Sequence, residues 1–437
     1  MTVTSTSKTK ELLDRQKKVL LPQQSRMLLY GDDPLAIDHA KDQWVWDIEG
    51  NKYLDFFGGI LTVSVGHCNE EVVEATYEQM KTTGHTSTLY LNEITIKVAE
   101  KIANLSPGRL QYCFFTNSGT EADETAIMAA REYTGNSDII SLRHAYSGRS
   151  VSMMTMTAHK PWRLGGVTDP NIKQVKNPYT YRKPDYMTEE QFLDFLIEDL
   201  EEMLATCTNG KIAAFMAEPI QGVGGFVVAP KDYFKRVAPI IKAAGGIMII
   251  DEVQTGWGRT GKYCCGIEHW GIEPEILTFA KGIANGAPVG CTIMVPEVAE
   301  AITGSTLSTY GGNPVSMAQA YATIAYIEKY KLWENAEKQG ARLRERMESM
   351  KERYDFIGDV RGMGLMQAFE MVVPDGNKTP DATQASKLTN AARKQGLLIG
   401  KGGLYGNVIR IAPHLNVSSE DIEAGCDLIE KALADIA

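Results

Sequence analysis

The segment from residue 247 to residue 282 constrains the fold of this chain more than any other. It contains two short apolar runs, Ile247–Ile250 and Ile276–Ala280, which end at Asp251 and Lys281. Apolar runs of this length without polar alternation are typical of strands buried on both faces of a parallel sheet. Because an open α/β sheet binds ligands at the carboxyl ends of its strands, we expect neighbouring strands to bring Asp251 and Lys281 into one binding site.

A third predicted strand ends in small hydroxyl residues. The apolar run 112–116 (YCFFT) precedes Ser118, Gly119 and Thr120, and an alanine-rich helical pattern follows. The first turn of a helix presents backbone N–H groups and the positive end of the helix dipole, which together attract phosphate. The hydroxyl groups of Ser118 and Thr120 can donate to the same anion. Ordinary helix capping explains the pattern equally well, so both interpretations stay open at this point.

Two further strand ends carry residues that suit a flat, charged ligand. The run 138–142 (DIISL) leads to Tyr146, whose ring can stack on a planar group, although a single aromatic residue there is more often only structural. The run 212–217 (IAAFMA) leads to Glu218, a second acid on the ligand side of the sheet. The glycines after Glu218 do not open a helix, so they are no dinucleotide-binding fingerprint.

The order of these patterns predicts an α/β protein with more than one domain. A chain of 437 residues exceeds what one hydrophobic core usually holds. The strand and helix patterns predict a large domain over residues 71–325. They predict a second, α+β domain over residues 326–437. Residues 155–187 have four prolines and little periodicity, and we expect them to form a long surface excursion.

Composition excludes several classes of function. The net charge of -10 disfavours a nucleic-acid-binding protein, which needs a basic surface. No window approaches ~18 uninterrupted apolar residues, so we expect no membrane-spanning helix. The seven cysteines are scattered and odd in number, which favours reduced thiols. The neighbours His67 and Cys68 have no partners at ligand spacing, so we predict no metal site.

The N-terminal segment 1–26 lacks the apolar core of a secretory signal. Glu11 and Asp14 lie within it and arginines are few, so a short amphipathic helix is favoured over a mitochondrial transit peptide. We therefore expect a cytoplasmic protein, with the mitochondrial matrix as the less favoured alternative.

The separate features fit one cofactor. Burial of a lysine disfavours its charged form, which lowers its pKa and makes its amine nucleophilic. Lys281 can then react with an aldehyde, and Asp251 can hold a protonated pyridine nitrogen. With residues 118–120 at a phosphate and Tyr146 at the ring face, the four attachments of pyridoxal 5'-phosphate (PLP) are accounted for. Any single lysine at a strand end is more often a surface residue, and only the combination argues against that reading here.

Several motifs also carry a resemblance to a known family. The chain resembles the class III (fold type I) PLP-dependent aminotransferases from about residue 30 to its end, through the motifs NSGTEA (117–122), HAYSGR (144–149), AEPIQG (217–222), DEVQTGWGRTG (251–261), FAKGIANG (279–286), TYGGNP (309–314), VRGMGL (360–365) and VIRIAP (408–413). Within the class it is most similar to the mitochondrial-type alanine–glyoxylate aminotransferase branch, through YLDFFGGILTVSVGHC (53–68), GHTST (84–88) and FMAEPIQGV (215–223). The resemblance implies a mostly parallel central sheet with helices on both faces. It also implies a smaller α+β domain built from both chain ends, to which residues 1–70 contribute.

The resemblance implies a role for each matching residue. Lys281 should form the Schiff base with PLP and then move the substrate proton, while Asp251 pairs with the pyridine nitrogen. Val253 should pack on the ring face opposite the tyrosine, and Gln254 should reach the phenolic oxygen. Glu218 aligns with a site acid whose role stays open.

Other matching residues should hold the phosphate and the substrate. Gly119 and Thr120 should bind the phosphate, and Thr309 should reach it from the other subunit of a homodimer, which could pair further into a tetramer. Arg410 should bind the substrate α-carboxylate through a bidentate fork. Tyr90 and Trp162 are expected to line the substrate pocket.

The implied reaction is ping-pong transfer of an amino group from alanine or a β-amino acid to glyoxylate or pyruvate. Ornithine- and aminobutyrate-type members have a glutamate after EPIQG that can pair with the carboxylate-binding arginine, whereas this chain has Val223. We therefore expect Arg410 to be free for a carboxylate. The alternatives are an amine:pyruvate transaminase, whose donor lacks an α-carboxylate, a lyase or racemase on the same scaffold, and a binding protein without turnover.

Overall fold

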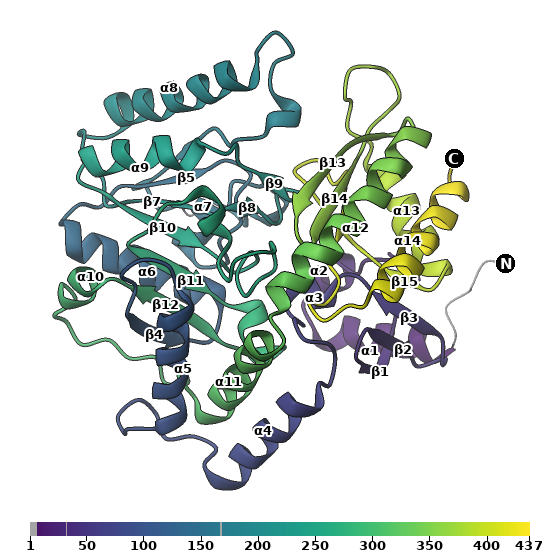
Figure 1. Ribbon diagram of the computed structural model, residues 1–437, viewed down its shortest axis with the longest axis horizontal. Coiled ribbons are helices and arrows are strands. Elements are labelled where there is room, and N and C mark those ends of the chain that lie inside the picture. The colour runs from purple at the N-terminus through teal and green to yellow at the C-terminus, as the bar shows by residue number, and fades with distance from the viewer. Residues whose placement is uncertain (1–6, 32, 167) are drawn as a thin grey trace.

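A seven-stranded sheet forms the centre of the larger part of the molecule (Figure 1). The computed structural model describes residues 7–31, 33–166 and 168–437. In spatial order the strands are β4 (Tyr112–Thr116), β12 (Gly290–Met294), β11 (Ile276–Phe279), β10 (Ile247–Asp251), β7 (Ala214–Ala217), β5 (Ile139–Leu142) and β6 (Ile172–Val175). The last five strands of this series run parallel, while β12 is antiparallel to both of its neighbours. As predicted, β10 and β11 are adjacent and parallel, with Asp251 opposite Thr278.

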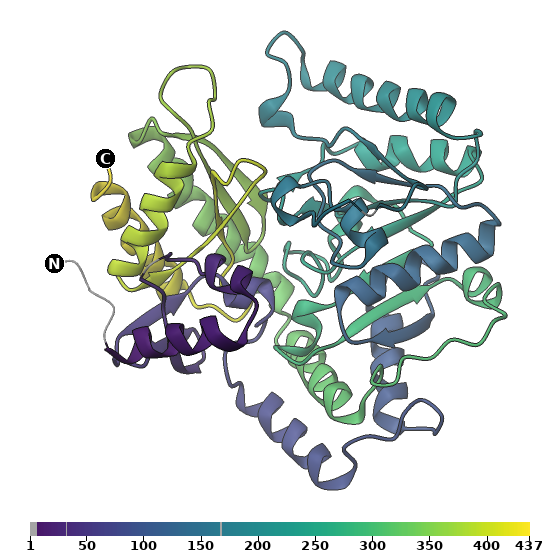
Figure 2. The ribbon, with the colours of Figure 1, turned by 180° about the vertical axis from the view of Figure 1, so that it is seen from behind.

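Helices cover both faces of this sheet, which explains its uninterrupted apolar strands. The helix α6 (Gly119–Thr134) lies on one face, and α8 (Glu189–Cys207) and α9 (Tyr233–Ala243) lie on the other (Figures 1 and 2). Every residue of β5, β7, β10, β11 and β12 is buried as a result. A capping box of Thr188 and Gln191 starts α8, and such a cap stabilises a helix by about 1 kcal/mol.

The remaining elements of this part flank the sheet. They are the helices α4 (Glu70–Thr82), α5 (Glu93–Leu105), α7 (Val151–Met156), α10 (Pro296–Glu300) and α11 (Pro314–Lys329), the 3-10 helices η1 (Lys160–Trp162), η2 (Thr180–Arg182), η3 (Gly266–Trp270) and η4 (Lys281–Ala284), and the short hairpin of β8 (Ile220–Gln221) and β9 (Val227–Val228). Asn69 caps α4 and Asn92 caps α5, each with its side-chain oxygen. Each cap lies directly before the point where apolar residues begin to recur at the spacing of a helix.

The two ends of the chain meet in the smaller part of the molecule (Figure 1). The N-terminal elements are α1 (Ser7–Val19), α2 (Pro22–Arg26), β1 (Ile37–Lys41), β2 (Trp44–Asp47), β3 (Lys52–Asp55) and α3 (Gly58–Leu61). The C-terminal elements are α12 (Leu332–Arg353), β13 (Ile357–Met363), β14 (Met366–Met371), α13 (Ala382–Lys394), β15 (Leu397–Leu398), β16 (Gly400–Gly402), β17 (Val408–Ile411) and α14 (Ser419–Ala434). β3 and β15 pair in parallel, which joins the chain ends in one sheet. The domain limits at 70 and 325 stay predictions.

Two predictions from sequence meet different outcomes here. The prediction that residues 155–187 form only a surface excursion is wrong, because β6 lies within them and pairs with β5 at the edge of the large sheet. The predicted N-terminal helix is present as α1 over the described residues, whereas residues 1–6 lie outside them. Within the described ranges, no helix is both long and apolar enough to cross a membrane. All seven cysteines are free thiols.

Candidate active site

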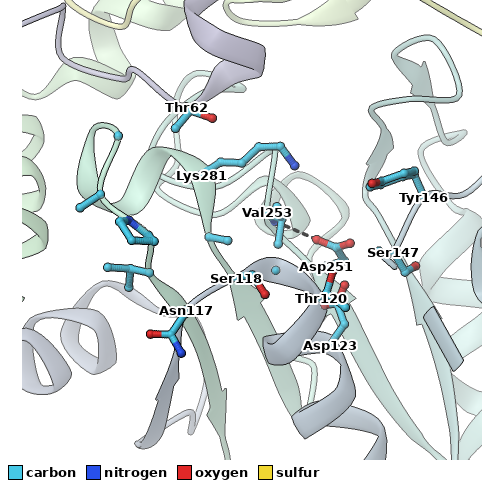
Figure 3. A pocket seen from close by; sticks show the side chains of 17 residues that line it. Thr62, Asn117, Ser118, Thr120, Asp123, Tyr146, Ser147, Asp251, Val253 and Lys281 are labelled. Atoms are coloured by element: carbon cyan, nitrogen blue, oxygen red, sulfur yellow. Dashed lines mark hydrogen bonds between the residues drawn. The ribbon is translucent and has the colours of Figure 1, made fainter. Parts of the chain in front are cut away.

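A cavity of about 350 Å³ opens where the parallel strands end and α6 begins. Seven of the predicted site residues line it, namely Ser118, Gly119, Thr120, Tyr146, Asp251, Val253 and Lys281. Figure 3 shows the side chain of Lys281 extending across the cavity toward the side where Asp251 and Tyr146 lie. The argument from strand ends is therefore correct for these residues. Side chains at the end of β10, after β11 and in the turn before α6 meet at one cavity.

Lys281 occupies a strained backbone position. It is the first residue of η4, and its φ of 43° lies in the left-handed region that a side chain with a Cβ rarely adopts. Its side chain is half-buried and lines the cavity. Burial lowers the pKa of the Lys281 amine, and the nearby carboxylates of Asp251 and Glu218 oppose that shift. A strained backbone and a lowered pKa together are typical of a reactive lysine rather than of a surface lysine.

Asp251 closes β10 at the floor of the cavity. Its side chain is 5% exposed, and its Oδ1 accepts a hydrogen bond of 2.9 Å from the backbone N–H of Val253. Burial raises the pKa of Asp251 to about 6, while the Val253 N–H and the charge of Lys281 act to lower it. A buried carboxylate with one remaining oxygen is suited to pair with a protonated ring nitrogen.

Asp123 is a second cavity acid, which the sequence argument missed. It lies on α6 and accepts a hydrogen bond of 2.7 Å from the hydroxyl of Thr278. Burial, and then the charge of Asp251, raise the pKa of Asp123 well above its usual value. The sequence does carry one sign that Asp123 is buried. It lies on the same helical face as Ala126 and Ile127, both of which are fully buried.

The turn before α6 acts both as a cap and as an open cradle. The Ser118 hydroxyl accepts from the backbone N–H of Glu121 at 3.2 Å, so the capping interpretation is correct. A helix start leaves four N–H groups without helical partners, and this cap uses only one of them. A Cβ on Gly119 would lie 3.3 Å from Val253, and one on Gly148 would lie 2.2 Å from the Thr120 hydroxyl. Small residues therefore keep the backbone accessible to an anion.

Tyr146 and Glu218 belong to one arrangement. The Glu218 carboxylate accepts from the backbone N–H of Tyr146 at 3.2 Å and from that of Gly222 at 2.8 Å. Burial raises the pKa of Glu218 to about 8, and the charge of Asp251 adds to the shift. Glu218 is not among the residues that line the cavity, and its visible role is to hold the loop of Tyr146. Trp162 packs edge-on against the Tyr146 ring, with centroids 5.5 Å apart.

Five other predicted residues lie outside the cavity wall within this single chain, namely Gln254, Thr309, Tyr90, Trp162 and Arg410. Gln254 is buried against Gly222, and its Oε1 has no hydrogen-bond partner among the described residues. Thr309 is exposed, and Tyr90 is 71% exposed. The roles predicted for them stay predictions.

Arg410 is a buried cation with unused hydrogen-bonding capacity. Its side chain is 6% exposed, and its Nη2 donates to the carbonyl of Lys401 at 3.0 Å. Its Nε and Nη1 have no partner among the described residues, and the rings of Phe57 and Phe226 lie 5.1 and 5.7 Å from its Cζ. Burial lowers the pKa of Arg410 to about 10, and Glu218 opposes the shift. A buried guanidinium with unpaired donors is suited to bind an anion such as a carboxylate.

The donor set fits PLP. Lys281 supplies a nucleophilic amine, Asp251 an unpaired carboxylate oxygen, the α6 turn an anion cradle, and Tyr146 and Val253 two walls around a flat ring. Each of these groups belongs to the protein and is already in place without the cofactor.

Comparisons with known proteins agree with this site. The sequence model of the family described as Aminotransferase class-III matches residues 30–433. The mitochondrial alanine–glyoxylate aminotransferase 2 homolog 2 of Arabidopsis thaliana is 40% identical over 94% of this chain and 85% of that protein. A probable 4-aminobutyrate aminotransferase of Bacillus subtilis (strain 168) is 34% identical over 89% of this chain and 90% of that protein. An amine transaminase from an uncultivated Pseudomonas species, solved in its PLP-bound form, is 31% identical with a TM-score of 0.88 over 93% of this chain and 96% of that one.

Proposed function

Because this chain belongs to the class III aminotransferases and is a PLP-dependent enzyme, we propose that its amino donor is alanine or a β-amino acid and its acceptor is glyoxylate or pyruvate. The observation that carries this proposal is the buried Arg410 with two unpaired donors. A substrate that leaves such a guanidinium unpaired loses affinity, whereas one that carries a carboxylate on its reacting carbon, or one carbon away, gains it.

Bound PLP supplies an electron sink for the bonds at the substrate α-carbon. The chain supplies the remaining chemistry. The amine of Lys281 is the group placed to take the α-proton and to return it, because burial lowers its pKa and so favours its neutral form. Asp251 favours a proton on the ring nitrogen. The α6 turn holds the phosphate, and Tyr146 and Val253 fix the plane of the ring.

Arg410 supports an α-carboxylate substrate because no acid of the described residues forms an ion pair with it. Val223, which replaces the glutamate of ornithine- and aminobutyrate-type members, is buried and offers no charge. Its carbonyl instead accepts from the N–H of Gly403. A substrate carboxylate therefore has no protein acid to displace from Arg410, which argues against a donor whose reacting amine is remote from its carboxylate.

A second candidate is an amine:pyruvate transaminase. Several similar structures are described as amine or ω-transaminases, at 25–33% identity. In such an enzyme Arg410 would bind only the keto acid. The donor half-reaction would then be independent of Arg410, whereas in our main proposal both half-reactions depend on it.

Replacing Arg410 with glutamine tests this distinction. We expect the apparent KM for alanine to rise by about a hundredfold, the effect of losing a charge-assisted bidentate pair. The rate with a donor lacking a carboxylate, such as 1-phenylethylamine, should change little. The measurement is the absorbance change as each donor converts the PLP form into the pyridoxamine form. Arg353→Gln, which removes a partly exposed ion pair between α12 and Glu430 of α14, is the control. An unchanged KM for alanine in Arg410→Gln would exclude the main proposal.

We also propose that two chains form a homodimer around Thr309. The exposed apolar residues Leu89, Leu91 and Tyr310 lie beside it, and Leu91 is 96% exposed. The two segments that carry them are joined, because Asn313 donates to the Gly84 carbonyl at 3.0 Å and the rings of His85 and Tyr310 lie 5.2 Å apart. An exposed apolar patch of this kind is typical of a protein interface. If a second copy of the chain binds this patch, Thr309 of one subunit can reach the phosphate site of the other.

Mixing two inactive variants tests the exchange of Thr309 between subunits. Lys281→Ala lacks the reacting amine, and Thr309→Asp places a negative charge against the phosphate. If Thr309 serves the partner subunit, co-refolded mixtures should recover about a quarter of the wild-type rate, since half of the random dimers then hold one intact site of two. No recovery above the separate variants would place Thr309 outside the partner's site. Size-exclusion chromatography with light scattering checks that dimers are present.

The compartment is a separate proposal. Seven free thiols favour a reducing environment, and we propose the cytoplasm. The plant relative carries a mitochondrial name, which keeps the mitochondrial matrix as the alternative.

A further inference from the structure

Three metal-ligating side chains converge outside the candidate active site. Asp55 ends β3, His67 lies in the turn that follows α3, and His414 follows β17. The Oδ2 atom of Asp55 lies 2.9 Å from Nε2 of His67 and 3.8 Å from Nε2 of His414. One ligand atom from each residue lies within 4.8 Å of the other two. Segments from the two chain ends therefore bring one carboxylate and two imidazoles to a single point.

The carboxylate of Asp55 is held in place by the backbone. Its Oδ1 accepts from the N–H groups of Phe57 and Gly58, both at 2.9 Å. These two bonds orient the side chain and leave Oδ2 facing the histidines. A ligating carboxylate is typically fixed in this way by its outer hydrogen bonds.

His414 is the observation that an ordinary ion pair does not explain. Its side chain is fully buried, and neither ring nitrogen has a hydrogen-bond partner among the described residues. Its ring meets that of His67 edge-on, with centroids 5.0 Å apart. Asp55 and His67 already satisfy each other, and the 3.8 Å gap to His414 is too long for a hydrogen bond. A buried imidazole directed at an acid and a second imidazole, yet bonded to neither, lacks a partner that a cation would supply.

We propose that Asp55, His67 and His414 bind one divalent transition-metal ion, with Zn²⁺ as the ion that this donor set favours. Imidazole nitrogen and carboxylate oxygen are usual zinc ligands, at distances of about 2.0–2.2 Å. The ligand atoms need to move only slightly to surround such an ion. Asp55 and His67 also line a separate cavity of about 520 Å³. The site does not depend on the proposed amino-group transfer.

A cation lies close to the proposed site, because Arg259 donates to the carbonyl of Pro413, the residue before His414. Arg259 repels a metal ion, so we expect micromolar affinity rather than the tighter binding of a structural zinc site with several thiolates.

An ion at this site would fix the chain segment between Asp55 and His67. Asp55 and His67 stand at the two ends of a segment whose residues Gly58 to Leu61 all have positive φ. The same segment carries Thr62, which lines the active-site cavity. An ion held at both ends, and by His414 from the other end of the chain, fixes this strained segment next to the cofactor site.

A zinc titration of the PLP-loaded enzyme tests the proposal. After chelator treatment and dialysis, isothermal titration calorimetry with Zn²⁺ should show one site per chain, and Zn²⁺ should raise the melting temperature. Co²⁺ bound at the same site should give visible absorption bands of a low-coordinate ion. His414→Leu should weaken zinc binding at least tenfold. Because that variant removes two unpaired buried nitrogens, it should still fold without the metal.

The control is His39→Gln. His39 and Asp38 form an exposed pair 2.8 Å apart with no third ligand among the described residues, so this variant should keep the full zinc stoichiometry. His67→Gln is the second ligand variant, and it should lose binding as His414→Leu does. Absence of saturable binding to the wild type, or equal binding by wild type and His414→Leu, would overturn the proposal.

Discussion

Replacing Lys281 with alanine is expected to abolish transamination while PLP still binds without a covalent bond. The variant loses the amine that both holds the cofactor and moves the substrate proton. The loss of turnover should exceed about a thousandfold, since general acid–base catalysis alone contributes about 10²–10⁴-fold. The cofactor should remain because the phosphate cradle, Asp251 and the walls of Tyr146 and Val253 are unchanged.

Single-turnover kinetics and absorbance measure the two halves of this prediction. The wild type should show a visible band that borohydride fixes to Lys281, whereas the variant should release PLP on gel filtration in denaturant. Lys173→Ala is the matched control, because Lys173 lies on β6 of the same sheet and pairs with Asp138 at 3.2 Å. If Lys281→Ala transaminates alanine at the wild-type rate, the assignment of the reacting lysine is wrong.

Reasoning from strand ends predicted the core of the site because parallel strands leave little freedom. Once β10 and β11 are adjacent and buried, their last residues must emerge at the same edge, and Asp251 and Lys281 do so. The caps at Asn69, Thr188 and Ser418 were also predictable, since each depends only on local spacing. Local spacing and strand burial are the two signals that a single sequence carries reliably.

Other features depend on long-range contacts that a single sequence does not display. β6 is a four-residue edge strand with a half-polar pattern, and its polar residues and the prolines that flank it at 170 and 178 obscured it. Asp123 enters the site only because α6 packs with that face against Thr278. Nothing near Glu218 in the sequence indicates that its carboxylate holds the backbone of Tyr146, which lies 72 residues earlier.

Asp251→Asn should have the second-largest effect on catalysis. The amide cannot keep the ring nitrogen protonated, so the cofactor becomes a weaker electron sink. We expect kcat to fall by about 10²–10³-fold, the range for removing one preorganised electrostatic contact from a buried site. The substitution is nearly isosteric and should leave the strand intact. Stopped-flow measurement of the alanine half-reaction gives the rate directly.

The neighbouring Glu252→Gln is the matched control for Asp251→Asn. Glu252 is equally buried, but its carboxylate accepts from the hydroxyl of Thr255 and the N–H groups of Gly266 and Ile267. Its loss should lower the melting temperature while kcat per folded enzyme stays within a few-fold of the wild type. Equal losses of kcat in the two variants would point to a general effect of removing a buried acid.

The pH dependence of cofactor uptake separates the two variants further. Burial raises the pKa of Asp251 to about 6, so the side chain is a carboxylate above that pH and becomes protonated as the pH falls through it. A protonated acid no longer balances the charge of a protonated pyridine nitrogen. PLP binding to the apoenzyme should therefore weaken below about pH 6 in the wild type and in Glu252→Gln. In Asp251→Asn, binding should already be weak at pH 7.5 and should lack this step, and a wild-type step in that variant would assign the titration to another group.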